Sequence, residues 1–257
     1  MILPIAVLQI LALSPQGAPH VAAGSHNQDA QWQQDLAAFD AELAKRQAAF
    51  ASLHLSGETK EDAKQILSHL CDLDQYARKY LAAPYEHRYG GTLAGTKFSE
   101  SFLPRLARID AVNLRGLKSL LDKWGWFNRA TWGDKADNEA WLLVQHADHD
   151  LLFQKRVLAL LEPLVGSGGT NPSGFAYLFD RVAVNERHLQ RFGTQGYCIG
   201  PGKWTPRPIE DPEHVDARRA AVGLRPLAEY IASFKDICHE DETRRALQAL
   251  GQPPQAP

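Results

Sequence analysis

Residues 141–161, with the sequence WLLVQHADHDLLFQKRVLALL, decide how the rest of this chain is interpreted. The segment is apolar nearly all round, which predicts one helix buried at the centre of a domain. Its middle nevertheless carries six polar side chains, those of Gln145, His146, Asp148, His149, Asp150 and Gln154. Polar groups in a buried helix cost free energy unless they are paired or used. We therefore expect a polar site on this helix, either functional or structural.

Most of the remaining chain is also helical in pattern. Apolar residues recur at three- to four-residue steps over 28–53 and 59–83, which predicts an N-terminal helical hairpin. Further helices are expected over the ranges 98–121 (one or two, because of Pro104), 174–185, 215–222, 227–234 and 243–250. Residues 188–209 are rich in Gly, Pro and aromatic side chains, which favours two short strands around a Gly-Pro-Gly turn. The predicted fold class is mainly α: a helical domain around the buried central helix with a small β-hairpin, plus the N-terminal hairpin.

The chain divides by sequence into four parts. They are a signal peptide over 1–23, a helical extension over 24–97, an α-rich core domain with the candidate site over 98–251, and a disordered tail over 252–257. Residues 2–13 are mostly apolar, and Val21-Ala22-Ala23 has the small residues that a signal peptidase reads. No Lys or Arg precedes Lys45, so the usual basic start is absent. We expect a periplasmic or secreted protein, or a cytoplasmic one if this segment is no signal.

The composition of the chain limits the kinds of binding partner that we expect. The net charge is −2 and no basic stripe is present, so nucleic acid is not expected as a partner. No apolar run reaches the ~18 residues of a membrane span, so we expect no integral membrane segment in the mature chain. A small-molecule or peptide ligand is compatible with the sequence. Cys71, Cys198 and Cys238 allow either one disulfide and one free thiol or three buried thiols.

Four short blocks within residues 124–230 resemble an uncharacterised bacterial family, a domain of unknown function. They read QHAD at 145–148, DRV at 180–182, GTQ at 193–195 and PIED at 208–211, followed by Arg219 and by Gly223-Leu224. The resemblance implies one shared domain, mostly helical with a small hairpin, and it supplies no activity. Residues 28–120 lie outside it and are expected to form a variable extension.

Metal binding is one interpretation of the polar cluster. On a continuous helix, residues three apart share a face, so His146 and His149 would point the same way. Two imidazoles one turn apart can ligate one divalent metal, with a carboxylate from Asp180, Glu210 or Asp211 completing the shell. The spacing differs from the i, i+4 histidines of the zinc protease motif.

Acid–base catalysis without a metal is the second interpretation. His146 would exchange a proton near neutral pH, and Asp180 would orient its ring. Arg181 or Arg219 would hold an anionic group of the substrate, and Gln195 would form a hydrogen bond with it. Gln145 and Asp148 complete the residues expected to bind the ligand.

A structural network is the third interpretation. His146, Asp180, Arg181 and Gln195 would then fix how the hairpin packs, and Arg219 would face solvent. The leading specific hypothesis is a hydrolase-type enzyme that uses His146 on a small polar or anionic substrate. The alternative is a non-catalytic binding or interaction module in which the same residues form a structural polar network. Whether the chain is an enzyme is left open by the sequence.

Overall fold

The computed structural model describes residues 25–84 and 93–238. By its contacts the chain divides into two compact units, with the division between residues 149 and 150. The expected signal peptide, the expected helix over 243–250 and the C-terminal tail lie outside the described residues. The fold is mainly α with one two-stranded antiparallel hairpin, as the sequence predicts. None of the described helices is long and apolar enough to cross a membrane.

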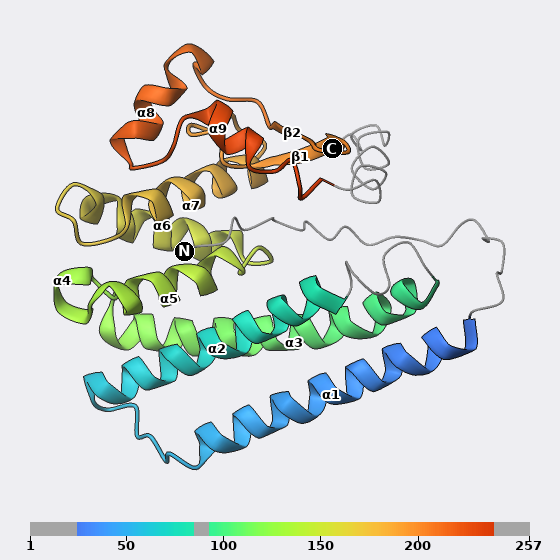
Figure 1. The fold of residues 1–257 in the computed structure, drawn as a ribbon. Helices are drawn as coiled ribbons and strands as arrows, with labels where there is room; N and C mark the ends of the chain where they lie inside the picture. Colours follow the sequence, from blue (N-terminus) through green and yellow to red (C-terminus); the bar gives the residue numbers. More distant parts are fainter. Residues whose placement is uncertain (1–24, 85–92, 239–257) are drawn as a thin grey trace. The chain divides into compact units, whose positions relative to one another are not determined.

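The N-terminal unit is built on three long helices that lie side by side in Figure 1. They are α1 (Ser25–Ala51), α2 (Lys60–Pro84) and α3 (Leu93–Trp124), and the short α4 (Arg129–Trp132) and α5 (Asp134–Gln145) follow. The hairpin of α1 and α2 is the one predicted from sequence. Pro104 lies inside α3 without interrupting it, and its side chain is exposed.

Aromatic and aliphatic side chains form a core between these three helices. Phe39, Phe98 and Phe102 are fully buried there, with Leu36, Leu73, Ala77, Ala94, Leu106 and Ile109 around them. Ion pairs at the rim join the same helices: Arg105 binds Asp40 at 2.8 Å, and Arg46 binds Asp72 at 2.7 Å. These contacts place all three helices in one unit.

The prediction of one continuous helix over residues 141–161 is wrong. Helix α5 ends at Gln145, residues 146–150 form a turn, and α6 (Leu151–Val165) begins after it. Asp150 caps α6 by accepting a hydrogen bond from the backbone N–H of Phe153 at 3.0 Å. Asp and Asn side chains bind nearby backbone N–H groups and so favour helix starts over helix interiors. The polar residues expected in the middle of one helix thus lie at the point where α5 ends and α6 begins.

The C-terminal unit combines helices with the hairpin. Helix α6 packs on α7 (Pro172–Asn185), and β1 (Gly196–Gly200) pairs with β2 (Lys203–Pro206) around the predicted Gly-Pro-Gly turn. A 3₁₀ turn, η2 (Pro212–His214), leads into α8 (Val215–Ala221), and α9 (Leu227–Ala232) follows (Figure 1).

An aromatic cluster and a disulfide fix the hairpin within this unit. Trp204 of β2 stacks on Phe234 with ring centroids 4.5 Å apart, and Tyr230 meets both rings edge-on. A disulfide joins Cys198 of β1 to Cys238, while Cys71 is a free, buried thiol in the other unit. Of the two cysteine arrangements left open by the sequence, the structure has the first.

Candidate functional site

A buried aspartate and a histidine form the most chemically suggestive pair in the N-terminal unit. His146 follows the last residue of α5, and its Nδ1 lies 2.9 Å from both carboxylate oxygens of Asp74 on α2. The side chain of Asp74 is 1% exposed and that of His146 is 12% exposed. The imidazole is therefore held by a buried carboxylate, and the His146 side chain as a whole keeps a small exposed fraction.

The charge of Asp74 determines which ring nitrogen carries the proton. Burial alone raises the pKa of Asp74, but the attraction and hydrogen bond of His146, together with Arg78, bring it below its ordinary value. An ionised carboxylate only accepts hydrogen bonds, so Nδ1 of His146 must donate. In the neutral ring Nε2 is then left with the lone pair. This is the tautomer in which Nε2 can accept a proton from a reacting group.

Three further side chains extend the pair into a network across α2 and α3. Arg78 lies 3.5 Å from Asp74 and 2.9 Å from Asp110, so one guanidinium bridges two carboxylates. Gln75 donates to the second oxygen of Asp74 at 2.8 Å. Burial raises the pKa of Asp110, which the charge of Arg78 partly offsets. The network fixes the position of Asp74, and through Asp74 it fixes the imidazole.

The other polar residues of the QHAD block have different environments. Gln145 is buried at the end of α5, whereas Asp148 and His149 are exposed in the turn. Because residues 146–150 are not helical, His146 and His149 lack the shared helical face on which metal binding was predicted. Over the described residues no three or more His, Cys, Asp or Glu side chains are grouped to hold a metal.

Asp180, predicted to orient His146, has its observed contacts in the loop after α7 of the C-terminal unit. Its carboxylate accepts hydrogen bonds from the backbone N–H groups of Arg191, Phe192 and Thr194 at 2.7–3.0 Å. The Thr194 hydroxyl donates a fourth at 2.9 Å. Burial raises the pKa of Asp180, whereas these four bonds act in the opposite direction. The carboxylate on Nδ1 of His146 is that of Asp74, which the sequence analysis did not select.

Gln195 and Arg219 also stabilise this loop. Gln195 donates from its side chain to the Thr194 hydroxyl at 3.1 Å, and its backbone N–H binds the side chain of Gln190. Arg219 is fully buried, which corrects the expectation that it faces solvent. Its guanidinium donates to the carbonyls of Phe192 and Arg225 at 2.6 and 2.7 Å and lies over the Tyr230 ring. Arg181 is buried in the same unit. The observed contacts of Asp180, Gln195 and Arg219 are thus made within the C-terminal unit.

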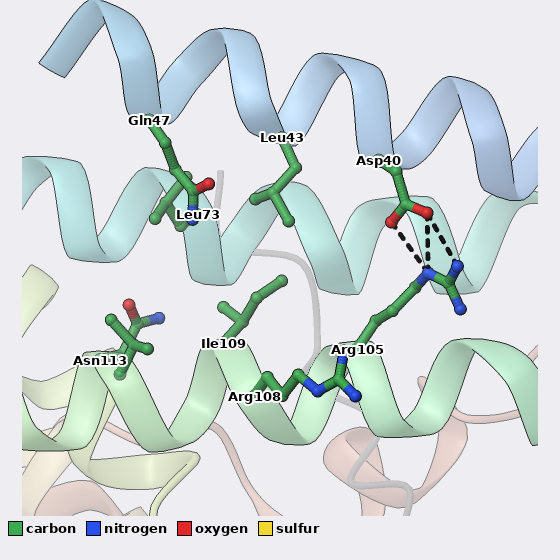
Figure 2. A pocket seen from close by; sticks show the side chains of 9 residues that line it. Asp40, Leu43, Gln47, Leu73, Arg105, Arg108, Ile109 and Asn113 are labelled. Carbon is green, nitrogen blue, oxygen red and sulfur yellow. Dashed lines mark hydrogen bonds and ion pairs between the residues drawn. The ribbon is translucent and has the colours of Figure 1, made fainter. Parts of the chain in front are cut away.

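A separate cavity of about 310 Å³ lies among α1, α2 and α3 (Figure 2). Its lining residues are Asp40, Leu43, Gln47, Leu73, Arg105, Arg108, Ile109, Val112 and Asn113. A second hollow of about 290 Å³ shares Asp40 and Arg105 with it. Neither cavity is lined by His146, so the enclosed space and the imidazole belong to different parts of this unit.

Asp74, Arg78 and Asp110 were not predicted from the sequence because residues 28–120 were expected to form a variable extension. The available signal was a charged residue inside an apolar stripe: Asp74 follows Leu73 and precedes Ala77, and both of these are buried. A carboxylate in such a stripe is buried only when it is paired. The partner, 72 residues further along the chain, could not be identified from helical spacing.

Comparison with known families finds one match. The model of a family of unknown function, DUF6624, matches residues 71–240. The chain belongs to this family. The match is longer than the resemblance over residues 124–230 and takes in Asp74, Arg78 and Asp110 as well as His146. No curated protein and no solved structure matches the chain.

Proposed function

We propose that this chain is a hydrolase-type enzyme in which His146 is the general acid–base group and Asp74 is its orienting carboxylate. The observation that carries the proposal is the bond from Nδ1 of His146 to a carboxylate that is almost completely buried. A carboxylate in this position selects the tautomer with a basic Nε2 and stabilises the imidazolium that forms during proton transfer. Asp74 takes the role that the sequence analysis gave to Asp180.

The proposed reaction needs no protein nucleophile. Nε2 of His146 removes a proton from water as the water attacks an electrophilic centre of the substrate. The imidazolium then returns the proton to the leaving group, so the ring ends the cycle neutral. Arg78 and Asp110 keep Asp74 in place throughout, since the guanidinium binds both carboxylates. The substrate class is a small polar or anionic molecule, as inferred from the sequence.

The decisive variant is His146→Asn. The amide nitrogen of Asn occupies nearly the position of Nδ1, so it can still donate to Asp74, but the variant has no equivalent of Nε2. We expect hydrolysis to fall about 10²–10⁴-fold, the usual contribution of a general acid or base. Stability should change by less than about 1 kcal/mol because the hydrogen bond to Asp74 is kept.

The assay compares wild type, His146→Asn and Asp74→Asn on a panel of small chromogenic carboxylic esters, phosphate esters and anilides. His149→Asn is the matched control, because His149 is exposed in the same turn. Equal rates for wild type and His146→Asn, or no turnover of any substrate class by wild type, would refute the proposal. A pH–rate profile whose ascending limb disappears in His146→Asn would support it.

A second candidate is a non-catalytic module in which the same residues act only as a structural network. The observation that favours it is that His146, Asp74, Arg78 and Asp110 connect the end of α5 with α2 and α3. This function predicts that His146→Asn behaves as wild type in every assay, because the bond across the helices is kept. The two candidate functions therefore predict different activities for the His146→Asn variant.

We also propose that the protein is exported. The Cys198–Cys238 disulfide supports this, since disulfides persist mainly in oxidising compartments. The expected signal peptide over residues 1–23 lies outside the described residues. N-terminal sequencing of the full-length gene product after expression in a bacterial host tests the proposal. Export predicts a mature chain that begins at Gly24, whereas a chain that retains Ile2 and the following residues contradicts it.

A further inference from the structure

The cavity among α1, α2 and α3 has the features of a ligand site that is separate from His146. We propose that it binds a small apolar molecule carrying an amide and a carboxylate, such as an N-acylated hydrophobic amino acid. The cavity combines a buried amide without a partner, an exposed guanidinium without a partner and an apolar wall. The inference does not rest on the proposed hydrolase function.

Asn113 provides the strongest indication of a ligand. Its side chain is 3% exposed, and neither its Nδ2 nor its Oδ1 has a hydrogen-bond partner among the described residues. Figure 2 shows this amide directed from α3 toward the space between the three helices. Buried polar side chains are nearly always hydrogen-bonded, so the amide calls for a partner inside the cavity. A ligand amide can provide one, since it accepts from Nδ2 and donates to Oδ1.

Charge at the mouth of the cavity favours an anion. Arg105 is already neutralised by Asp40, with two guanidinium nitrogens within 2.8 Å of the carboxylate. Arg108, three residues further along α3 and on the same helical face, is exposed and has no ion pair or hydrogen bond among the described residues. The three charged side chains that line the cavity therefore sum to +1. A guanidinium binds carboxylates through paired hydrogen bonds, which makes a carboxylate the expected anionic group.

The rest of the wall limits the body of the ligand. Leu43, Leu73, Ile109 and Val112 line the cavity from all three helices, and Val112 is 44% exposed. An aliphatic or aromatic side chain on the ligand would cover this surface. The volume of about 310 Å³ is at the small end of the roughly 300–1,000 Å³ typical of ligand sites. It suits a single acylated amino acid better than a long peptide or a lipid.

The test is a ¹H–¹⁵N NMR titration of the full chain with N-acetyl-leucine. We expect the side-chain amide signals of Asn113 to shift, with a dissociation constant of about 1 mM or tighter for a ligand of this size. N-acetyl-leucinamide lacks the carboxylate and 4-methylpentanoate lacks the amide. Each should bind about tenfold more weakly, because each loses roughly one charged or two neutral hydrogen bonds.

Two variants locate the site. Asn113→Leu removes the amide and keeps the number of side-chain heavy atoms, and Arg108→Gln removes the charge, so each should weaken binding about tenfold. Arg115→Gln is the matched control, an exposed arginine of α3 that does not line the cavity. His146→Asn should bind as wild type, which separates this inference from the hydrolase proposal.

Two outcomes would overturn the inference. One is no shift of the Asn113 amide signals at probe concentrations up to about 10 mM, which corresponds to negligible affinity. The cavity would then hold water only. The other is wild-type affinity in both Asn113→Leu and Arg108→Gln, which would place the bound probe elsewhere. Tighter binding of 4-methylpentanoate than of N-acetyl-leucine would also reject the role given to Asn113.

Discussion

Replacing Asp74 with Asn should destabilise the N-terminal unit by about 3 kcal/mol, because removing one partner of a buried ion pair costs about 3–5 kcal/mol. Two contacts place the expected value at the lower end. Arg78 keeps Asp110 at 2.9 Å, and the amide oxygen of Asn can still accept a hydrogen bond from His146. At about 2–4 °C for each kcal/mol in a chain of this size, the melting temperature should fall by roughly 6–12 °C.

Intrinsic fluorescence during urea unfolding measures the loss of stability in the N-terminal unit. Five of the six tryptophans lie before residue 150, at positions 32, 124, 126, 132 and 141, and only Trp204 lies after it. Trp126 is buried and donates to Asp137 at 2.7 Å, so its emission should change when this unit unfolds. The midpoint should move to lower urea while the slope stays constant.

The difference in unfolding free energy between wild type and Asp74→Asn should depend on pH, and this dependence identifies its origin. The pKa of Asp74 is lower in the folded protein than its ordinary 3.8, so the carboxylate stabilises the fold above the unfolded-state pKa. That contribution is lost as the pH falls through the lowered folded-state pKa. The difference in unfolding free energy between wild type and Asp74→Asn should therefore shrink at pH values below 3.8.

Asp72→Asn is the matched control on the same helix. Asp72 is 48% exposed and pairs with Arg46 at 2.7 Å, so its loss should cost less than about 1 kcal/mol. The reasoning is refuted if Asp74→Asn costs no more than Asp72→Asn. It is also refuted if the gap between wild type and Asp74→Asn persists unchanged in strong acid, since the buried charge would then not be its cause.

Three further outcomes are expected. Replacing Cys198 and Cys238 with Ser should destabilise the C-terminal unit by about 4 kcal/mol, which is the loop-entropy value for a separation of 40 residues. Calorimetry with and without reductant measures this loss, and an unchanged melting temperature would contradict it. Asp180→Asn should reduce the hydrogen-exchange protection of the backbone amides of Arg191, Phe192 and Thr194, which donate hydrogen bonds to the carboxylate. Unchanged protection would show that other contacts hold the loop. Burial raises the pKa of the Cys71 thiol to about 12, so it should react with thiol reagents only after unfolding, and rapid labelling of the native protein at pH 8 would disprove its burial.

The helix over residues 141–161 shows how far periodicity can be misleading. Apolar residues on all sides predicted one buried helix, and the polar residues in its middle then looked like a buried site. In the structure those residues form the turn between α5 and α6, where Asp148 and His149 are exposed. When the turn between two successive helices is short, their apolar residues can give one continuous pattern in the sequence. The N-cap preference of Asp150 was the local signal that could have separated them.

His146 could be selected as a candidate residue without the correct helix, but its partner Asp74 could be identified only from the tertiary structure. Asp180 was chosen because it lies in an apolar helix, and it is indeed fully buried. Its observed hydrogen bonds are to the loop at residues 191–194, while Asp74 binds the imidazole. Both aspartates have the same sequence signature of a charge among apolar residues. Only the packing of α5 on α2 distinguishes them.

The sequence alone determined the mainly helical fold, the hairpin around the Gly-Pro-Gly turn and the family to which the chain belongs. These features depend on local propensity and on periodicity, which are encoded within windows of about 20 residues or fewer. The tertiary structure decided the pairing of His146 with Asp74, the pairing of Cys198 with Cys238 and the cavity beside Asn113. Such features depend on which helix faces pack together, and the packing brings side chains separated by 40 or 72 residues into contact.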